Sequence, residues 1–262
     1  MAKPRLAVHK FTSCDGCQLA FLNAGEALLT LSDLVDIVHF SEAGMLKPEA
    51  KVDIAFVEGS IYTPDEIQRI NTIRANSKHL ITIGACATTG GIQALRNAAN
   101  YQAWMASIYA TPHTINTLAT STAIANHVHV DWELWGCPVN TQQVLGVVRA
   151  LLFGAAPKIK RDAVCHECKR QGHVCVVVTK HEPCMGPVTQ TGCGALCPGV
   201  GRACYACYGP SENTNTHALG LQFKQHGLSE DKIAQQFLHI NNQAPAFHQA
   251  GAYFKGIHIV KA

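Results

Sequence analysis

The sequence has 262 residues, of which 47% are hydrophobic and 15% are charged, and its formal net charge is +3 at pH 7. A chain of this length and composition can bury a full core, which excludes a disordered protein, and its weak charge does not indicate a nucleic-acid partner. The N-terminus shows no export signal, and the most apolar run, 144–156, is interrupted by Arg149 and is too short to cross a bilayer. We therefore expect a cytoplasmic, globular protein that does not enter a membrane.

Strand and helix patterns alternate through the first part of the chain. Short β-branched and apolar runs predict strands at 5–9, 35–40, 52–57, 79–83 and 129–134. Amphipathic spacing predicts helices at 18–29 and 141–153, and a capping box formed by Thr63 and Glu66 predicts the start of another. This alternation is typical of an α/β domain with a parallel sheet covered by helices on both faces.

The chain changes character after residue 157. Residues 158–210 are rich in Cys, Gly and Pro but poor in large apolar side chains, so hydrophobic burial alone cannot hold them together. Helical patterning returns from residue 211, and Ser229 predicts the cap of a helix that runs to Ile240. The sequence therefore predicts an α/β domain at 1–157, a small irregular cysteine-rich domain at 158–210 and a helical tail at 211–262.

The twelve cysteines can be grouped into sets of four. Four of them follow predicted strand ends, at Cys14, Cys17, Cys86 and Cys137, and the other eight lie within 165–207. The carboxyl ends of parallel strands meet at one edge of a sheet, where loops converge on a ligand. Cubane iron-sulfur clusters take four cysteine thiolates each, so the count predicts three clusters and an electron path.

Two other uses of cysteine compete with this interpretation. A reducing compartment disfavours disulfides, and twelve cysteines in 262 residues lie below the density of a disulfide scaffold. The two Cys-x-x-Cys pairs, Cys165/Cys168 and Cys204/Cys207, are also compatible with structural zinc. The dispersed first quartet argues against zinc, because zinc ligands usually come in close pairs.

Six motifs, taken in order, resemble the small subunit of nickel-iron hydrogenases. They are Cys14-Asp15-Gly16-Cys17, Glu58-Gly59, Gly84-Ala85-Cys86-Ala87, Gly136-Cys137-Pro138, Cys184-Met185-Gly186-Pro187 and the block from Cys193 to Cys207. Any one of these motifs alone is weak, and the resemblance depends on their shared order. It implies a flavodoxin-like first domain and a nickel-iron centre carried by a separate large subunit.

The resemblance also assigns every cysteine to one of three 4Fe-4S clusters. The implied ligands are Cys14, Cys17, Cys86 and Cys137 for the proximal cluster, Cys165, Cys168, Cys175 and Cys184 for the distal cluster, and Cys193, Cys197, Cys204 and Cys207 for the medial cluster. Spacing alone leaves the division of the last eight open, because ligands of neighbouring clusters interleave in two-cluster ferredoxins. All twelve cysteines are thus expected to bind iron.

Two positions differ from the membrane-bound uptake branch of that family. There, a histidine typically stands at the position of Cys165 and a proline at that of Cys197. A fourth medial cysteine implies a four-iron medial cluster, whose added thiolate should lower the reduction potential. Together with the missing export signal, this implies a cytosolic type, most similar to the delta subunit of NADP-linked sulfhydrogenases.

Glu58 is the only candidate in this chain for a role in proton chemistry, and no catalytic residue is otherwise expected. The Glu-Gly pair recurs in the resembled family, where this carboxylate would relay a proton or tune the proximal site. A polar residue at the end of a strand is equally explained as a hydrogen-bonding cap. Both interpretations of Glu58 stay open at the level of sequence.

The resemblance implies the electron-transfer small subunit of a cytoplasmic, bidirectional nickel-iron hydrogenase. The chain has no GxGxxG fingerprint, so flavin and NADP(H) are expected on partner subunits, together with ferredoxin-like subunits and a sulfur-reducing activity as an option. Alternatives are the small subunit of a coenzyme F420-linked or heterodisulfide-linked hydrogenase, a quinone-reductase subunit, a stand-alone multi-cluster ferredoxin-like carrier and a zinc-stabilised interaction protein. The quinone-reductase subunit is disfavoured because adjacent cysteines are expected in its first motif, whereas Cys14 and Cys17 are separated.

Overall fold

The computed structural model describes residues 3–257, and the chain forms two compact units, Met1–Lys158 and Ile159–Ala262. The cysteine-rich segment and the C-terminal helices belong to the same, second unit. No helix within residues 3–257 has both the length and the apolar character that spanning a membrane requires. Each unit is described separately below.

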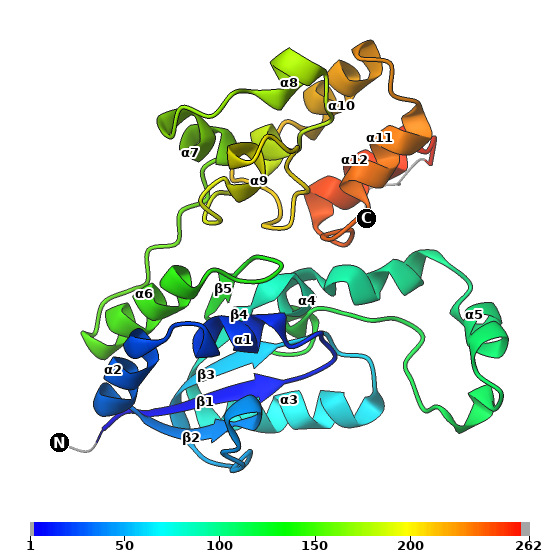
Figure 1. The fold of residues 1–262 in the computed structure, drawn as a ribbon. Coiled ribbons are helices and arrows are strands. Elements are labelled where there is room, and N and C mark those ends of the chain that lie inside the picture. Colours follow the sequence, from blue (N-terminus) through cyan, green and yellow to red (C-terminus); the bar gives the residue numbers. More distant parts are fainter. Residues whose placement is uncertain (1–2, 258–262) are drawn as a thin grey trace. The chain divides into compact units, whose positions relative to one another are not determined.

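The described part of the first unit contains a five-stranded sheet in which all neighbouring strands are parallel (Figure 1). The strands, in the order β2-β1-β3-β4-β5, are β2 (Asp36–Phe40), β1 (Arg5–Lys10), β3 (Val52–Glu58), β4 (Ser77–Ile83) and β5 (Trp132–Leu134). This is the doubly wound order of flavodoxin-like folds, in which ligands bind beyond the carboxyl ends of the strands. The prediction of a parallel α/β sheet is confirmed.

Helices cover both faces of this sheet, as Figure 1 shows. One face carries α1 (Gly16–Leu22), α2 (Glu26–Leu34) and α6 (Thr141–Leu152), and the other carries α3 (Pro64–Asn76). Side chains alternate along a strand, so Phe56 packs edge-on against Phe21 of α1 while Val57 joins the core beneath α3. Burial on both faces explains why the strands are almost continuously apolar.

The ends of these helices test the sequence prediction directly. The capping box is present, because Glu66 N–H donates to Thr63 Oγ1 at 3.3 Å and Thr63 N–H donates to Glu66 Oε2 at 3.1 Å. The single helix predicted at 18–29 is wrong, since the chain breaks between α1 and α2. Gly25 has a φ of 57° there, which turns the backbone out of the right-handed helix.

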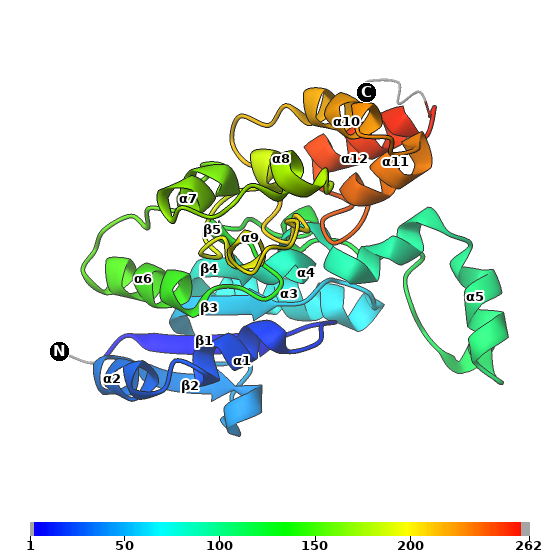
Figure 2. The same cartoon turned by 45° about the horizontal axis from the view of Figure 1, so that its top comes forward.

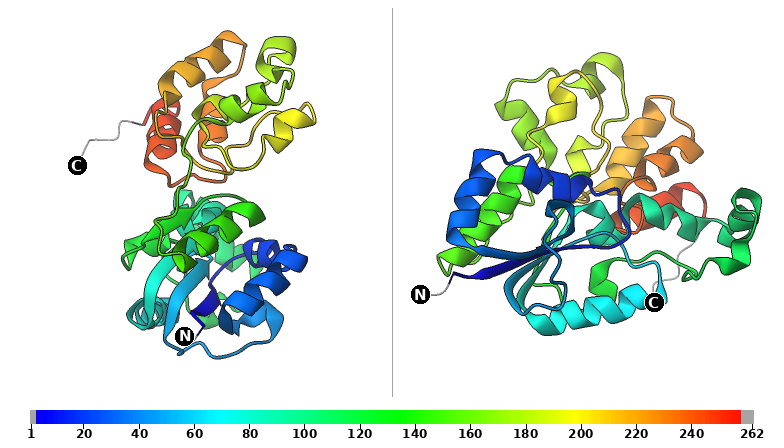
Figure 3. Two further views of the ribbon diagram at one scale, coloured as in Figure 1. Left: turned by 90° about the vertical axis from the view of Figure 1, so that its left-hand side faces the viewer. Right: turned by 60° about the horizontal axis from the view of Figure 1, so that its bottom comes forward.

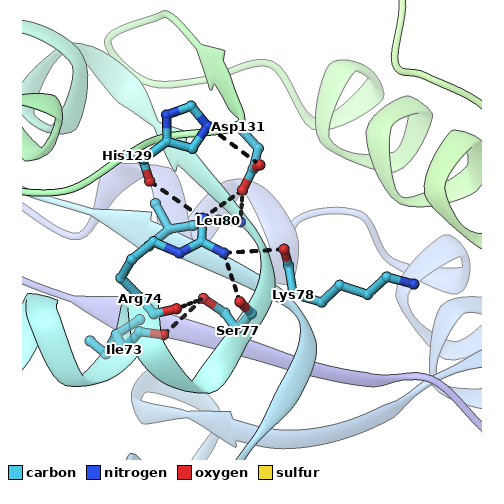
Figure 4. A network of polar contacts seen from close by, with 7 residues as sticks. All are labelled: Ile73, Arg74, Ser77, Lys78, Leu80, His129 and Asp131. Carbon is cyan, nitrogen blue, oxygen red and sulfur yellow. Dashed lines mark hydrogen bonds and ion pairs between the residues drawn. The ribbon is translucent and has the colours of Figure 1, made fainter.

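Strand β5 begins at Trp132, three residues after the predicted start at 129. Figure 4 shows the reason: the Asp131 carboxylate accepts the Leu80 N–H at 2.8 Å and an Arg74 N–H at 2.6 Å. Arg74 also donates to the backbone carbonyls of Ser77, Lys78 and His129. Before β5, a side-chain network therefore joins the backbone hydrogen bond from Asp131 N–H to Leu80 O, at 2.9 Å, in holding this segment to β4.

A long excursion joins β4 to β5. It contains α4 (Gly84–Thr89), the 3-10 helix η2 (Gly91–Ala98), α5 (Tyr101–Ile108), η3 (Pro112–Thr114) and η4 (Ile124–Asn126). None of the residues of α5, all of which are described, is buried, and Figure 2 shows this helix held away from the sheet. Asn97 closes the base of the excursion by exchanging two 2.8 Å hydrogen bonds with the Ser121 backbone. A short η1 (Ser41–Ala43) follows β2.

The second unit begins with short helices and ends in longer ones. Its elements are α7 (Val164–Arg170), α8 (Val176–Lys180), η5 (Gly186–Val188), α9 (Leu196–Gly199), α10 (Thr216–Gln225), α11 (Glu230–Phe237) and α12 (Pro245–Phe254). Helices α10, α11 and α12 pack together (Figure 3) around Phe223, Phe237, Phe247 and Phe254, each at most 4% exposed. Helix α11 begins after Ser229 as predicted but ends at Phe237, before Ile240, and the Ser229 side chain makes no capping bond.

Candidate iron-sulfur sites

The first cysteine quartet lies at the carboxyl edge of the sheet. Cys14 precedes α1, Cys17 is in the first turn of α1, Cys86 is in α4 and Cys137 follows β5. The loops that follow β1, β4 and β5 meet here, since Ala85 N–H donates to Gly136 O at 2.7 Å and a Cβ added at Gly84 would overlap Cys17 Sγ. Three separate strand ends therefore bring these thiols to one place.

Glycines make this approach possible. Gly84 has a φ of +84° and Gly91 a φ of +58°, a backbone conformation that strains other residues. A Cβ added at Gly91 would lie 2.9 Å from Cys86 Sγ, and one at Gly16 would lie 3.4 Å from Cys14 Sγ. Glycine backbone therefore lies close to the sulfurs of Cys14, Cys17 and Cys86.

The pKa values of these thiols reflect both their burial and the charges of one another. Burial raises the pKa of Cys86 to about 12, and the charges of Cys137 and Cys14 add to the rise. Burial also raises the pKa of Cys17, with further contributions from Glu58, Cys86 and Cys137. Such thiols stay protonated at neutral pH unless a metal binds them, because coordination removes the proton outright.

Glu58 acts on the protein backbone beside this quartet. Its carboxylate, 1% exposed at the end of β3, accepts the Cys17 N–H at 3.0 Å and the Gln18 N–H at 3.1 Å. It thereby caps α1 from a different element, while the residue before the helix, Asp15, makes no capping bond and pairs with Lys10. Burial raises the pKa of Glu58, and the two backbone hydrogen bonds oppose that rise.

A second quartet gathers in the second unit. Cys165 and Cys168 lie on α7, Cys175 precedes α8, and Cys184 follows it. Burial raises the pKa of Cys165 to about 11, and Cys184, Cys168 and Cys175 raise it further through their charges. A Cβ added at Gly186 would lie 3.4 Å from Cys184 Sγ and 3.5 Å from Cys165 Sγ, so these two sulfurs share a neighbour.

The remaining four cysteines are Cys193, Cys197, Cys204 and Cys207. Burial raises the pKa of Cys204, to which Cys184 and Cys207 contribute, and Cys204 N–H donates to Cys184 Sγ at 3.2 Å. Burial raises the pKa of Cys193, the backbone amides of Ala195 and Leu196 oppose the rise, and the charge of Glu167 adds to it. Burial raises the pKa of Cys184, and the charges of Cys175 and Cys197 add to that rise. Cys184 therefore adjoins both C-terminal sets.

The donor sets suit cubane clusters. Across residues 3–257 no three His, Cys, Asp or Glu side chains are gathered for one metal ion. In a cubane each thiolate binds a different iron. Each of the first two quartets provides four neighbouring thiols. Beside their sulfurs lies glycine backbone, which leaves space that a side chain would fill. When bound, such clusters supply one-electron transfer.

Several features of these sites were not predicted from the sequence. The capping of α1 by Glu58 joins residues about forty positions apart. Gln93, which lies on the 3-10 helix η2 seven positions after Cys86, forms a side-chain hydrogen bond with Cys86. The Gly90-Gly91 pair after Cys86 was a signal for close backbone approach, as isolated glycines often are. No sequence signal links Glu58 to α1.

Comparison with known proteins agrees with this geometry. Residues 14–151 match the family described as NADH ubiquinone oxidoreductase, 20 Kd subunit. Sulfhydrogenase 2 subunit delta of Pyrococcus furiosus is 32% identical over 232 residues, which is 88% of this chain and 97% of that protein. A subunit of the F420-non-reducing hydrogenase vhu of Methanococcus voltae is 28% identical, over 80% of this chain and 83% of its own length.

A solved structure shares the fold. A chain of an NAD+-reducing [NiFe]-hydrogenase in the H2-reduced state superposes with a TM-score of 0.56 and 24% identity, over 60% of this chain and 95% of that chain. The fold therefore defines a class of protein: a parallel α/β domain with cysteines at the carboxyl edge of its sheet. The chain belongs to the family of the NADH ubiquinone oxidoreductase 20 Kd subunit. Its resemblance to nickel-iron hydrogenase small subunits is confirmed.

Proposed function

We propose that this chain is the electron-transfer small subunit of a cytoplasmic, bidirectional nickel-iron hydrogenase. The observation that carries the proposal is the meeting of Cys14, Cys17, Cys86 and Cys137 at the carboxyl edge of a parallel sheet. Hydrogen is split on a partner large subunit, and its two electrons leave one at a time through this chain. The protein accordingly has no catalytic residue of its own.

The twelve cysteines hold three 4Fe-4S clusters in this proposal. The proximal cluster takes the quartet of the first unit, the distal cluster takes Cys165, Cys168, Cys175 and Cys184, and the medial cluster takes Cys193, Cys197, Cys204 and Cys207. Support for the distal set comes from its thiols raising one another's pKa values through their charges. Support for the medial set comes from the Cys204 and Cys207 pair and from the count of twelve.

Glu58 serves as a positioning residue in this arrangement. Its two hydrogen bonds fix the first turn of α1, which contains Cys17, at the end of β3. A carboxylate held by two backbone amides is already engaged, which favours this role over that of a proton relay.

The electrons are exchanged with flavin and NADP(H) on partner subunits, of which one is ferredoxin-like. The likeness to sulfhydrogenase 2 subunit delta, over 88% of this chain, supports this subtype and a sulfur-reducing option. The likeness to a subunit of an F420-non-reducing hydrogenase favours, among the alternatives, a heterodisulfide-linked complex over one linked to coenzyme F420. A stand-alone carrier remains the alternative outside hydrogenases.

The test is to purify the complex without oxygen through a tag on this chain and to measure nickel, iron, acid-labile sulfide and hydrogen-dependent NADP and NAD reduction. Nickel, about twelve cluster irons in this subunit and NADP reduction are expected. NAD or F420 reduction would correct the subtype only. Iron without nickel would indicate a carrier, and zinc without sulfide would overturn the proposal.

A further inference from the structure

A pair of glycines folds the 3-10 helix η2 back against Cys86. Gly90 and Gly91 have φ values of 82° and 58°, left-handed conformations that redirect the chain after α4. Gly90 N–H donates to Cys86 O at 3.0 Å, and a Cβ added at Gly91 would lie 2.9 Å from both Cα and Sγ of Cys86. Gln93, the third residue of η2, forms a side-chain hydrogen bond with Cys86 as a result.

The far end of η2 is fixed by its own side chains. Asn97 exchanges two 2.8 Å hydrogen bonds with the backbone of Ser121. The Arg96 guanidinium lies over the rings of Tyr62 and Tyr101, at 4.3 and 4.6 Å from their centroids. Anchors at both ends of η2 therefore keep the amide of its first turn beside the sulfur.

The oxygen of the same amide has no partner. Gln93 Oε1 is buried and makes no hydrogen bond among residues 3–257. A buried amide oxygen without a partner costs free energy, so the stability of the fold does not explain this side chain. The contact with the Cys86 sulfur explains it. A thiolate that binds iron carries no proton, so the amide must approach it with an N–H group.

Gln93 and the anionic neighbours of Cys86 have opposite effects on this thiol. Burial raises the pKa of Cys86, and nearby groups that carry negative charge, such as Glu58, raise it further. The hydrogen bond from Gln93 lowers the pKa. A donor that favours negative charge on a ligand sulfur also favours reduction of the cluster, since hydrogen bonds to the sulfurs help to set its potential.

We propose that the Gln93 amide donates an N–H group to the Cys86 thiolate and raises the reduction potential of the cluster in the first quartet. This role rests on the proposed function, because it requires a cluster there. The hydrogen bond is stronger when the sulfur is more negative, so it stabilises the state with one added electron more than the oxidised state. No proton is transferred. Gln93 thereby helps this site to accept electrons from the partner subunit.

The test is a redox titration of the complex purified through this chain, followed by electron paramagnetic resonance. The signal that Cys86→Ser alters identifies the cluster of the first quartet. Gln93→Met and Gln93→Leu both remove the donor, and methionine also keeps the length of the side chain. The matched controls are Gln102→Met and Gln102→Leu, at an exposed position of α5.

Gln93→Met and Gln93→Leu should lower the ratio of reduced to oxidised cluster at a fixed potential about tenfold, which equals about 59 mV for one electron. Iron and sulfide content should stay unchanged. Pulsed resonance measurements in D2O should also show one exchangeable proton fewer near the reduced cluster. Both controls should behave as the wild type does.

An unchanged potential in the Gln93 variants would overturn the role of Gln93. Loss of the cluster from both variants would overturn it too, since Gln93 would then be needed for assembly and not for the potential. Failure of the proposed function has a different result: the wild-type complex would show no cluster signal that Cys86→Ser alters.

Discussion

The two regions that gather cysteines differ in how much hydrophobic core supports them. In the first unit, the strands behind Cys14, Cys17, Cys86 and Cys137 belong to a hydrophobic core on both faces of the sheet. In the second unit, residues 159–210 have only short helices, and the large buried phenylalanines lie beyond them in α10–α12. We therefore expect the first site to be imposed by the fold, and the second to depend on a bound ligand for its order.

Removal of the iron should reveal the largest difference in stability between the two regions. Chelation under mild conditions is expected to leave β1, β3 and β4 folded and to release residues 164–207, because metal binding there supplies folding free energy. Hydrogen exchange measured on the loaded and iron-free chain checks this. Amides of α7, α8 and α9 should lose nearly all protection, and those of the central strands should keep theirs. Equal loss in both regions would refute the distinction.

Glycine substitutions should also affect the two regions unequally. In Gly84→Ala, the added Cβ would overlap Cys17 Sγ and the φ of +84° is strained, so the first quartet should be displaced. We expect a loss of about four irons per chain, measured by iron and sulfide analysis. In Gly186→Ala, the contacts of 3.4 and 3.5 Å with Cys184 and Cys165 are ordinary, so the iron content should be kept.

A control separates overlap from backbone strain. Gly154→Ala has a φ of +67° but no atom within 4 Å of the added Cβ, so it carries the strain alone. This variant should lose about 1–2 kcal/mol of stability and no iron. Normal iron content in Gly84→Ala would show that the approach of Gly84 to Cys17 does not matter to the first site.

Loss of the Glu58 carboxylate should loosen α1 without unfolding the sheet. Glu58→Ala removes the carboxylate that accepts two backbone hydrogen bonds, which together stabilise α1 by about 2 kcal/mol. The exchange rates of α1 amides should rise by roughly 30-fold as a result. Glu26→Ala, which removes an exposed acidic residue from the first turn of α2, is the matched control and should change little. Equal effects of the two substitutions would exclude a special role for Glu58.

The sequence predicted those parts of the fold that depend on local pattern. Apolar runs located all five strands of the described sheet, and Thr63 and Glu66 located the start of α3. The break at Gly25 was missed because the amphipathic pattern continues through α1 into α2. The pairing of Glu58 with α1 was missed because it joins elements far apart in the chain. Long-range side-chain contacts thus mark the limit of what local pattern can predict.

The sheet edge at β5 offers the smallest and most specific test of the first region. Burial raises the pKa of Asp131, but the hydrogen bonds from Leu80 N–H and Arg74 outweigh it and hold this pKa below its ordinary value. Asp131→Asn should cost about 1 kcal/mol, since the site is partly exposed to solvent. Because the folded-state pKa is lowered, the contribution of Asp131 is present above the ordinary pKa near 4 and is lost as the pH falls below it.

Hydrogen exchange of the Leu80 and Trp132 amides, in iron-free chains so that acid-labile clusters play no part, measures this contribution. The difference between wild type and Asp131→Asn should be full at pH 7 and should shrink below about pH 4. Asp36→Asn, at the exposed start of β2, is the matched control and should show no such difference. A difference that persists unchanged into acid would mean that the shape of Asp131, rather than its charge, holds β5. The first region would then depend on packing alone even at its edge.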